Sequence, residues 1–125
     1  MMATDDFAEH VARVRARFAA KLNDKIAESF AELDKMSAGN ADSVETVIIA
    51  HRRLHEMYGI APTLGFAATG QAAGAARTVV RDAAKSKRAL RPEEIAALKS
   101  ELERLREAAT ADLREFSSEM ASDAS

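Results

Sequence analysis

The sequence predicts an all-α fold, an antiparallel up-down bundle of four helices. Three observations support this fold class. The 125 residues are rich in alanine, leucine, glutamate and arginine, which favour helices. Apolar residues recur at steps of three and four along four stretches, as they do on the buried face of a helix. The only run rich in β-branched residues is VETVII at 44–49, so nothing indicates a sheet.

The first helical stretch occupies most of the N-terminal third of the chain, and Thr4 or Asp5 can cap its start. Asn23 and Asp24 can bend it, so it is either one long helix or two helices broken near residue 23. The polar turn cluster SAGNAD at 37–42 ends it. Its apolar stripe consists of Phe7, Val11, Val14, Phe18, Leu22, Ile26, Phe30 and Leu33.

The second helix is expected from about Ser43, which Asp42 or Ser43 itself can cap, to Ala61. It should end there because Pro62 lacks an amide hydrogen and biases Ala61 away from the helical region.

The third helix is expected from Gly65 or Phe66 to Lys85, and it contains the small-residue segment AATGQAAGAAR. Gly70 and Gly74 lie one turn apart, where they would let a neighbouring helix come close. Each costs about 1 kcal/mol relative to alanine, so close packing is the simplest explanation for them.

The fourth helix is expected to start at Pro92, a favoured first position, with Glu93 and Glu94 in its first turn. The four helices form one domain over residues 1–125, with 1–4 and 121–125 as loose tails. The apolar stripe of this last helix consists of Ile95, Leu98, Leu102, Leu105, Ala109, Leu113, Phe116 and Met120.

Composition excludes several classes of function. The chain has no cysteine, which excludes disulfides and thiolate chemistry. A net charge of −2 argues against a dedicated nucleic-acid binder. No apolar run reaches the roughly 18 residues of a membrane span, and the acidic first residues lead into no signal-type core, so a cytoplasmic protein is expected. A basic group near the end of the third helix is interpreted as a helix end and a solvated loop: Arg77, Arg81, Lys85, Lys87, Arg88 and Arg91.

His55 lies at the margin of the core face of the second helix, when residues are placed at about 100° per residue. Core neighbours can hold its imidazole there while one ring nitrogen meets water. Gly59, one turn later, removes the side chain that would crowd this nitrogen, so a partner or a phosphoryl group could approach. The alternative is a structural histidine beside a glycine that serves close packing.

The order of residues around His55 resembles that of histidine phosphotransfer (HPt) domains over essentially the whole chain. That family carries a histidine, an apolar residue two positions on, a glycine four on, and an apolar-glycine pair nine and ten on. The matching residues are His55, Met57, Gly59, Leu64 and Gly65, followed by Phe66. His51 does not fit the motif, because His55 stands where its glycine should be.

The resemblance implies a phosphorelay intermediate. His55 would accept a phosphoryl group from the aspartyl phosphate of a response-regulator receiver domain. A sensor histidine kinase, which can be of the hybrid type, could supply the group by way of such a receiver. His55 would then pass the group to another receiver. No ATP-binding signature is present, so the chain is expected to be a phosphoryl carrier and not an enzyme. It is expected to have no cofactor of its own, with magnesium on the receiver, and to be a monomer rather than a homodimer.

Tyr58 departs from the family pattern, because the position three after the histidine is often lysine. We expect Arg52, one turn before His55, to compensate in part by contacting the phosphoryl group. The departure also leaves open a non-catalytic adaptor that docks receivers without efficient transfer.

A docking surface for the receiver is expected beside His55. It consists of Ile48, Ile49, Glu56 and Ile60. Ile49 and Ile60 fall on the polar side of the second helix, and the alternative is that they pack under the end of the first helix.

Two other functions compete with the phosphorelay. His51 and His55 have the spacing of helix-borne metal ligands, but Gly59 replaces the second histidine of an HExxH site, and no Glu-x-x-His pair exists. No metal site is therefore expected. The second competitor is a helical adaptor or dimerisation module built on the long fourth helix.

Overall fold

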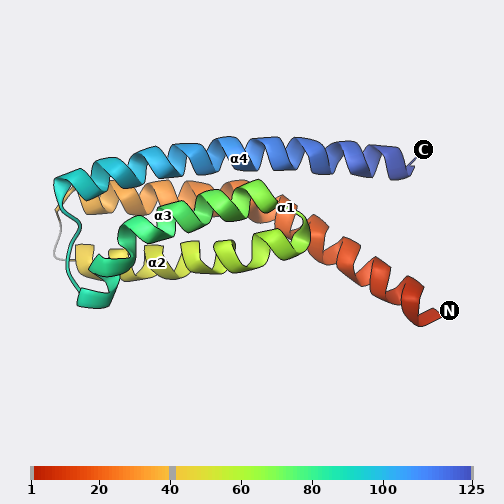
Figure 1. The fold of residues 1–125 in the computed structure, drawn as a ribbon, viewed down its shortest axis with the longest axis horizontal. Coiled ribbons are helices and arrows are strands. Elements are labelled where there is room, and N and C mark those ends of the chain that lie inside the picture. The colour runs from red at the N-terminus through yellow and green to blue at the C-terminus, as the bar shows by residue number, and fades with distance from the viewer. Residues whose placement is uncertain (1, 40–41, 125) are drawn as a thin grey trace.

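The computed structural model describes residues 2–39 and 42–124 and confirms the all-α four-helix bundle (Figure 1). Over these residues the chain forms no strand. The elements in chain order are α1 (Met2–Ser37), α2 (Ser43–Ile60), the short 3-10 helix η1 (Ala61–Leu64), α3 (Ala67–Ser86) and α4 (Pro92–Ala124). None of these helices, within the described ranges, is long and apolar enough to cross a membrane.

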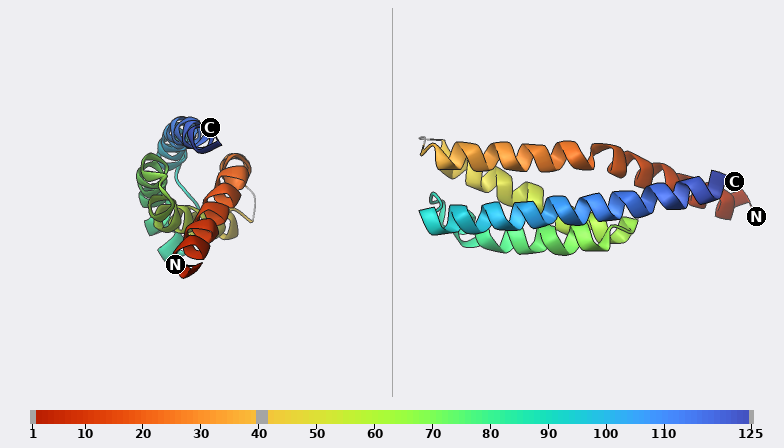
Figure 2. Two further views of the ribbon diagram at one scale, coloured as in Figure 1. Left: turned by 90° about the vertical axis from the view of Figure 1, so that its right-hand side faces the viewer. Right: turned by 90° about the horizontal axis from the view of Figure 1, so that it is seen from above.

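α3 lies between α2 and α4, and α1 packs against both α2 and α4. α1 and α4 are much longer than the other two helices, and their outer ends project past η1 at the end of the molecule where both termini lie (Figures 1 and 2). α1 runs through the exposed Asn23 and Asp24 without a break, so it is one helix and not two.

The helices also extend further than expected at both ends. Residues 2–4 belong to α1 and residues 121–124 to α4, although loose tails were predicted there; residues 1 and 125 lie outside the described residues. Alanine, methionine and glutamate near these ends favour continued helix, and no proline or glycine interrupts them. The turn cluster at 37–42 falls partly on residues 40–41, which are also outside the described part.

The core is formed by most residues of the stripes that the periodicity predicted, but the outermost residues of two stripes, Phe7 and Met120, are 68% and 45% exposed. Both lie on the outer ends of α1 and α4, past the end of α2 and α3. Leu22, Leu54, Val80 and Leu105, one from each helix, are completely buried. The aromatic ring of Phe66 packs at the end of the bundle near η1, with its centroid 5.1 Å from that of Phe18.

α2 ends where Pro62 predicted, and η1 turns the chain into α3. Gly65 closes this turn in the left-handed conformation with φ of 89°, which favours glycine. Arg15 of α1 fixes the turn from outside, because its Nε donates a hydrogen bond of 2.8 Å to the carbonyl oxygen of Leu64.

The start of α3 has no local capping side chain, because Phe66 occupies the position before it. Asp112 of α4 supplies the missing acceptor. Its Oδ2 accepts hydrogen bonds of 2.8 Å from both the backbone N–H and the Oγ1 of the buried Thr69. A carboxylate at this place satisfies a free N–H group and complements the positive end of the helix dipole.

The start of α4 is stabilised by Glu94. Its Oε1 accepts a hydrogen bond of 2.9 Å from the backbone N–H of Arg91, and its two oxygens pair with Arg88 at 2.8 and 3.1 Å. This is the acidic half of a capping box. The guanidinium of Arg88, helped by the Arg91 N–H, lowers the pKa of Glu94 to about 2.

We expect Asp112→Ala to lower the free energy of unfolding by about 1–2 kcal/mol, the usual effect of losing a helix cap. Urea unfolding followed by circular dichroism measures this change. Glu115→Ala, an exposed change on the same helix, is the matched control and should leave stability nearly unchanged. Equal stability of the two variants would contradict the capping role.

We expect Glu94→Gln to lower the melting temperature at pH 7. Because the folded-state pKa is depressed from 4.5 to about 2, the carboxylate stabilises the fold above pH 4.5 and loses this effect as pH falls toward 2. The difference in melting temperature between wild type and variant should therefore shrink over this pH range. A difference that stays constant down to pH 2 would be inconsistent with the ion pair.

Candidate functional site

His55 lies on the outer surface of α2, and its side chain is exposed to solvent. Gly59, one turn further along the same face, has no atom within 4 Å of the place where a Cβ would stand. The predicted open space beside the imidazole is therefore present. Nothing in the packing of the described residues requires glycine at this position, although glycine lowers helix stability there.

Gly74 of α3 gives the opposite result, because a Cβ there would lie 2.7 Å from Cδ1 and 2.9 Å from Cε1 of Tyr58. The Tyr58 ring thus rests directly on the backbone of α3. A Cβ at Gly70 would likewise lie only 2.5 Å from Cγ of the Pro62 ring. The prediction that these two glycines of α3 allow a close helix approach is confirmed.

Arg77 is the cation nearest to His55 among the described contacts. Its Nη1 lies 3.4 Å from Nδ1 of His55, and its Cζ lies 4.6 Å from the centroid of the Tyr58 ring. Gly74 and Arg77 are three residues apart on α3, so they share one face of the helix. Tyr58 therefore spans this face from Gly74 to Arg77, and cation–π attraction of about 0.5–2 kcal/mol holds the guanidinium beside the imidazole.

The positive charge of Arg77 is not neutralised by a carboxylate in the described structure. Within the same part of the chain, its buried Nε has no hydrogen-bond acceptor. Arg81 and Lys85 follow at steps of four residues on the same helix. This side of His55 is consequently positive, which suits an anionic group such as a phosphoryl.

His51 lies one turn before His55, and the two rings are nearly parallel with centroids 6.1 Å apart. His51 is half-buried, and its Nε2 lacks a hydrogen-bond partner among the described residues. Burial lowers the pKa of His51, and the nearby His55, Arg77, Arg81 and Lys85 lower it further. The imidazole of His51 therefore favours its neutral form and is partly packed against its neighbours.

The other predicted site residues lie on the opposite side of His55, toward α1. Arg52 and Glu56 are exposed, and no hydrogen bond or ion pair joins Arg52 to His55 in the described structure. Ile48 is half-buried, whereas Ile49 and Ile60 are 37% and 46% exposed. Both isoleucines border hollows that residues of α1 and α2 line together, and part of each side chain remains open to solvent.

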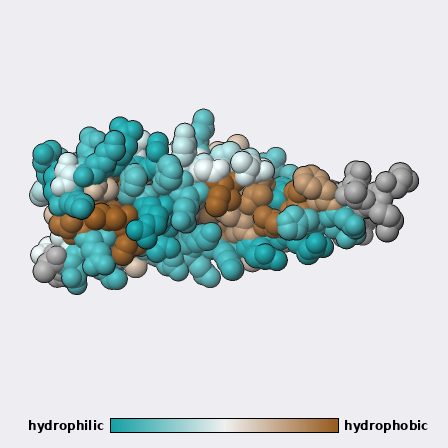
Figure 3. Space-filling model, turned by 90° about the horizontal axis from the view of Figure 1, so that it is seen from below, coloured by the Kyte–Doolittle hydropathy of each residue, from teal (hydrophilic) through white to brown (hydrophobic). Residues whose placement is uncertain are grey.

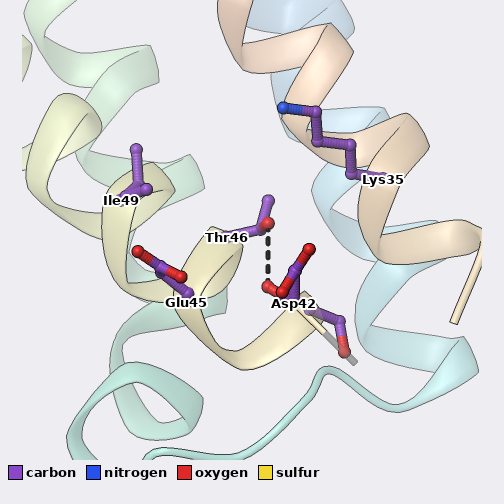
Figure 4. Close-up of a pocket in the computed structure, with 6 residues that line it drawn as sticks. Lys35, Asp42, Glu45, Thr46 and Ile49 are labelled. Atoms are coloured by element: carbon purple, nitrogen blue, oxygen red, sulfur yellow. Dashed lines mark hydrogen bonds between the residues drawn. The ribbon is translucent and has the colours of Figure 1, made fainter. Parts of the chain in front are cut away.

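The hollow that Ile49 borders lies at the start of α2 and not at His55 (Figure 4). Lys35 of α1 stands across from Asp42 and Thr46, whose Oγ1 donates a hydrogen bond of 3.0 Å to the carbonyl oxygen of Asp42. This bond belongs to the first turn of α2. His55 is not among the residues that line this hollow.

Sequence reasoning missed the role of Arg77, which it assigned to a basic helix end. A signal was present, because Arg77 follows Gly74 by three residues and so shares its face of the helix. The contact itself depends on the rotation of α3 against α2, which one helix pattern does not contain. No cluster of three or more possible metal ligands occurs within residues 2–39 and 42–124.

We expect opposite effects on stability from adding one methyl group at two glycines. Gly59→Ala should raise the free energy of unfolding by up to about 1 kcal/mol, because the space is open and alanine favours helix. Gly74→Ala should lower it, because the new methyl group displaces the Tyr58 ring. Urea unfolding of the two variants measures both changes, and a change of the same sign in both would contradict this geometry.

A scan against protein-family models gave no match, and neither did comparisons with curated proteins and with solved structures.

Proposed function

We propose that the protein is a phosphoryl carrier in a phosphorelay, with His55 as the residue that is phosphorylated. One observation carries the proposal: an exposed imidazole has open space over Gly59 on one side and a guanidinium 3.4 Å away on the other. The resemblance of residues 55–66 to HPt domains supports the same chemistry.

In the proposed reaction, a ring nitrogen of neutral His55 attacks the phosphorus of an aspartyl phosphate on a receiver domain. The N–P bond forms as the P–O bond to the aspartate breaks, and the aspartate leaves as a carboxylate. Transfer to a second receiver is the reverse of this step. Magnesium on the receiver would neutralise part of the phosphoryl charge, and Arg77 would neutralise another part from the carrier.

The proposed partners follow from this chemistry. Receiver domains would dock on the face around His55, with the exposed Ile49, Ile60 and Glu56 as contacts on the α1 side. A sensor histidine kinase would supply the phosphoryl group by way of a receiver, and such relays place the protein in the cytoplasm. The carrier itself needs no ATP site.

Tyr58 supports the competing proposal of a receiver-docking adaptor, because it replaces the lysine usual at this position in HPt domains. The geometry favours transfer over simple docking, since the Tyr58 ring positions Arg77 near the imidazole. Tyr58 and Arg77 together would then do what one lysine does in that family.

Incubation with a ³²P-labelled receiver tests the function. Wild type should acquire an acid-labile, alkali-stable label that His55→Gln lacks and that the control variant His51→Gln retains. An adaptor would bind the receiver in a pull-down assay without acquiring label. Absence of label from every cognate receiver that binds would overturn the carrier function.

The role of Arg77 is tested by transfer rates. We expect Arg77→Ala to slow transfer about 10–100-fold, because a positioned charge near the phosphoryl group is lost. Arg52→Ala should slow it as well, but less, since no hydrogen bond joins Arg52 to His55 in the described structure. Arg104→Ala, an exposed arginine on α4, is the matched control and should leave the rate unchanged.

Variants of Tyr58 test whether its ring speeds transfer by holding Arg77 beside His55. Tyr58→Phe keeps the ring and should keep the rate, whereas Tyr58→Ala should be as slow as Arg77→Ala. The double variant Tyr58→Ala/Arg77→Ala should be no slower than either single variant, because both remove the same interaction. Strictly additive effects would show that Tyr58 does not act through Arg77.

A further inference from the structure

The side of α3 that lies beside His55 carries a row of positive charges. Arg77, Arg81 and Lys85 follow one another at steps of four residues, so they share one side of the helix. Arg77 contacts the imidazole of His55, and Arg81 and Lys85 are exposed. At about 1.5 Å per residue, the row extends about 12 Å along α3 from the level of His55. These three residues are called the basic row below.

The basic row also faces the half-buried His51 of α2. Burial is the largest cause that lowers the pKa of His51, and the neighbouring His55, Arg77, Arg81 and Lys85 lower it further. Among the described residues, no carboxylate is one of the groups that shift this pKa. The surface where α2 and α3 meet is therefore positive from His55 to the end of α3.

Carboxylates of the chain itself leave the basic row largely uncompensated. In the described structure, Arg77 and Lys85 form no ion pair. Nε of Arg81 lies 3.9 Å from Oδ1 of Asp82, its neighbour in the sequence, and both side chains are exposed. A long, exposed pair of this kind contributes little. The charges of the row thus remain free to attract a partner.

The end of the helix does not account for the whole row. Lys85 lies in the last turn of α3, where a cation complements the helix dipole. Arg77 and Arg81 lie before that turn, and the dipole effect falls off within it. Arg88, in the loop that follows, is bound to Glu94 and belongs to the start of α4. A different role is therefore needed for Arg77 and Arg81.

The apolar surface near His55 is too divided to form a docking face alone. Ile49 and Ile60 lie about three helical turns apart, with the exposed Arg52 and Glu56 between them. Figure 3 shows the molecule from the side on which α2 lies, and apolar residues form separate patches there among hydrophilic ones. A partner centred on His55 consequently meets charged groups as well, and those on the α3 side are positive.

We propose that the basic row docks an acidic surface of the receiver domain, with Arg81 and Lys85 determining the affinity for this partner. The proposal rests on the phosphorelay function. A receiver presents an aspartate as phosphoryl acceptor together with oxygen ligands, mainly carboxylates, that hold magnesium, so the surface that meets His55 is acidic. A standard interface covers about 800 Å² of each partner, which corresponds to a radius of roughly 16 Å. Arg81 and Lys85 therefore lie within reach of a receiver centred on His55.

The three residues of the row have different effects in this arrangement. Arg77 lies beside the imidazole and acts on the transfer step. Arg81 and Lys85 lie one and two turns further along α3, where charges change the rate of association and its salt dependence. An acidic protein is favoured over a nucleic acid, because the row has only three cations in a chain with a net charge of −2.

Charge reversal tests the docking role. The rate of transfer from a ³²P-labelled receiver, measured against receiver concentration, gives a half-saturating concentration and a maximal rate. In about 0.1 M salt, Arg81→Glu/Lys85→Glu should raise the half-saturating concentration about tenfold or more and keep the maximal rate within about twofold. The difference should shrink in about 1 M salt, because the Debye length falls from about 10 Å to about 3 Å. Arg77→Ala should instead lower the maximal rate.

Two control variants accompany the test. Arg81→Lys/Lys85→Arg keeps both charges and should transfer like wild type. Lys99→Glu/Arg104→Glu, on exposed positions of α4, changes the net charge by the same amount as the reversal variant. It should leave the half-saturating concentration unchanged, because α4 does not pack against α2. Circular dichroism confirms that each variant is folded.

The outcomes separate the docking role from the carrier function. A receiver that labels wild type and the reversal variant with the same half-saturating concentration would overturn the docking role and leave the carrier function intact. A receiver that binds wild type but not the reversal variant, without labelling His55, would support docking and contradict the carrier function. A wild type that binds no receiver would overturn both. Binding of a short DNA duplex that the reversal alone abolishes, with receiver binding unchanged, would assign the row to nucleic acid and overturn the proposal.

Discussion

The close contact between α2 and α3 is the constraint on which the candidate site depends. Two glycines of α3 leave its backbone bare, and Pro62 and the Tyr58 ring pack directly against it. Larger residues at either position would push the helices apart or displace the ring. Glycine lowers helix stability at both places, and the contact with the neighbouring helix gives a physical reason for keeping it.

This contact determines what surrounds His55. Because the Tyr58 ring lies along α3, it brings Arg77 over its face and close to the imidazole. Gly59 keeps the other side open, and the half-buried His51 packs one turn below without adding a positive charge near pH 7. An exposed imidazole, a nearby cation and open space at Gly59 therefore come together on one surface.

Most of the fold could be predicted from the sequence, because apolar periodicity reports which face of each helix is buried. The prediction placed the start of α2 and α4 and the helix end before Pro62 correctly, and also the core stripes, apart from Phe7 and Met120 at their outer ends. It also expected open space at Gly59 beside His55, and no atom lies within 4 Å of the place where a Cβ would stand there. These features depend on local sequence, so local patterns contain them.

Contacts between helices far apart in sequence could not be predicted in the same way. Asp112 caps α3 from 43 residues away, and Arg77 approaches His55 across a helix interface. Both depend on the rotation and offset of whole helices, which a single helix pattern does not specify. Loose tails were predicted because chain ends are generally poorly ordered, yet the helices continue through residues 2–4 and 121–124, where residue preferences favour helix.

Nuclear magnetic resonance tests the central claim most directly, through the α-protons of Gly74 and the side-chain protons of Tyr58 and Arg77 in the unmodified protein. A cation stacked on an aromatic face experiences its ring current. The δ-methylene protons of Arg77 should therefore shift upfield, and the Tyr58 ring protons should show nuclear Overhauser contacts to the α-protons of Gly74. Arg77 shifts typical of an exposed arginine, with no Tyr58–Gly74 contact, would contradict the account.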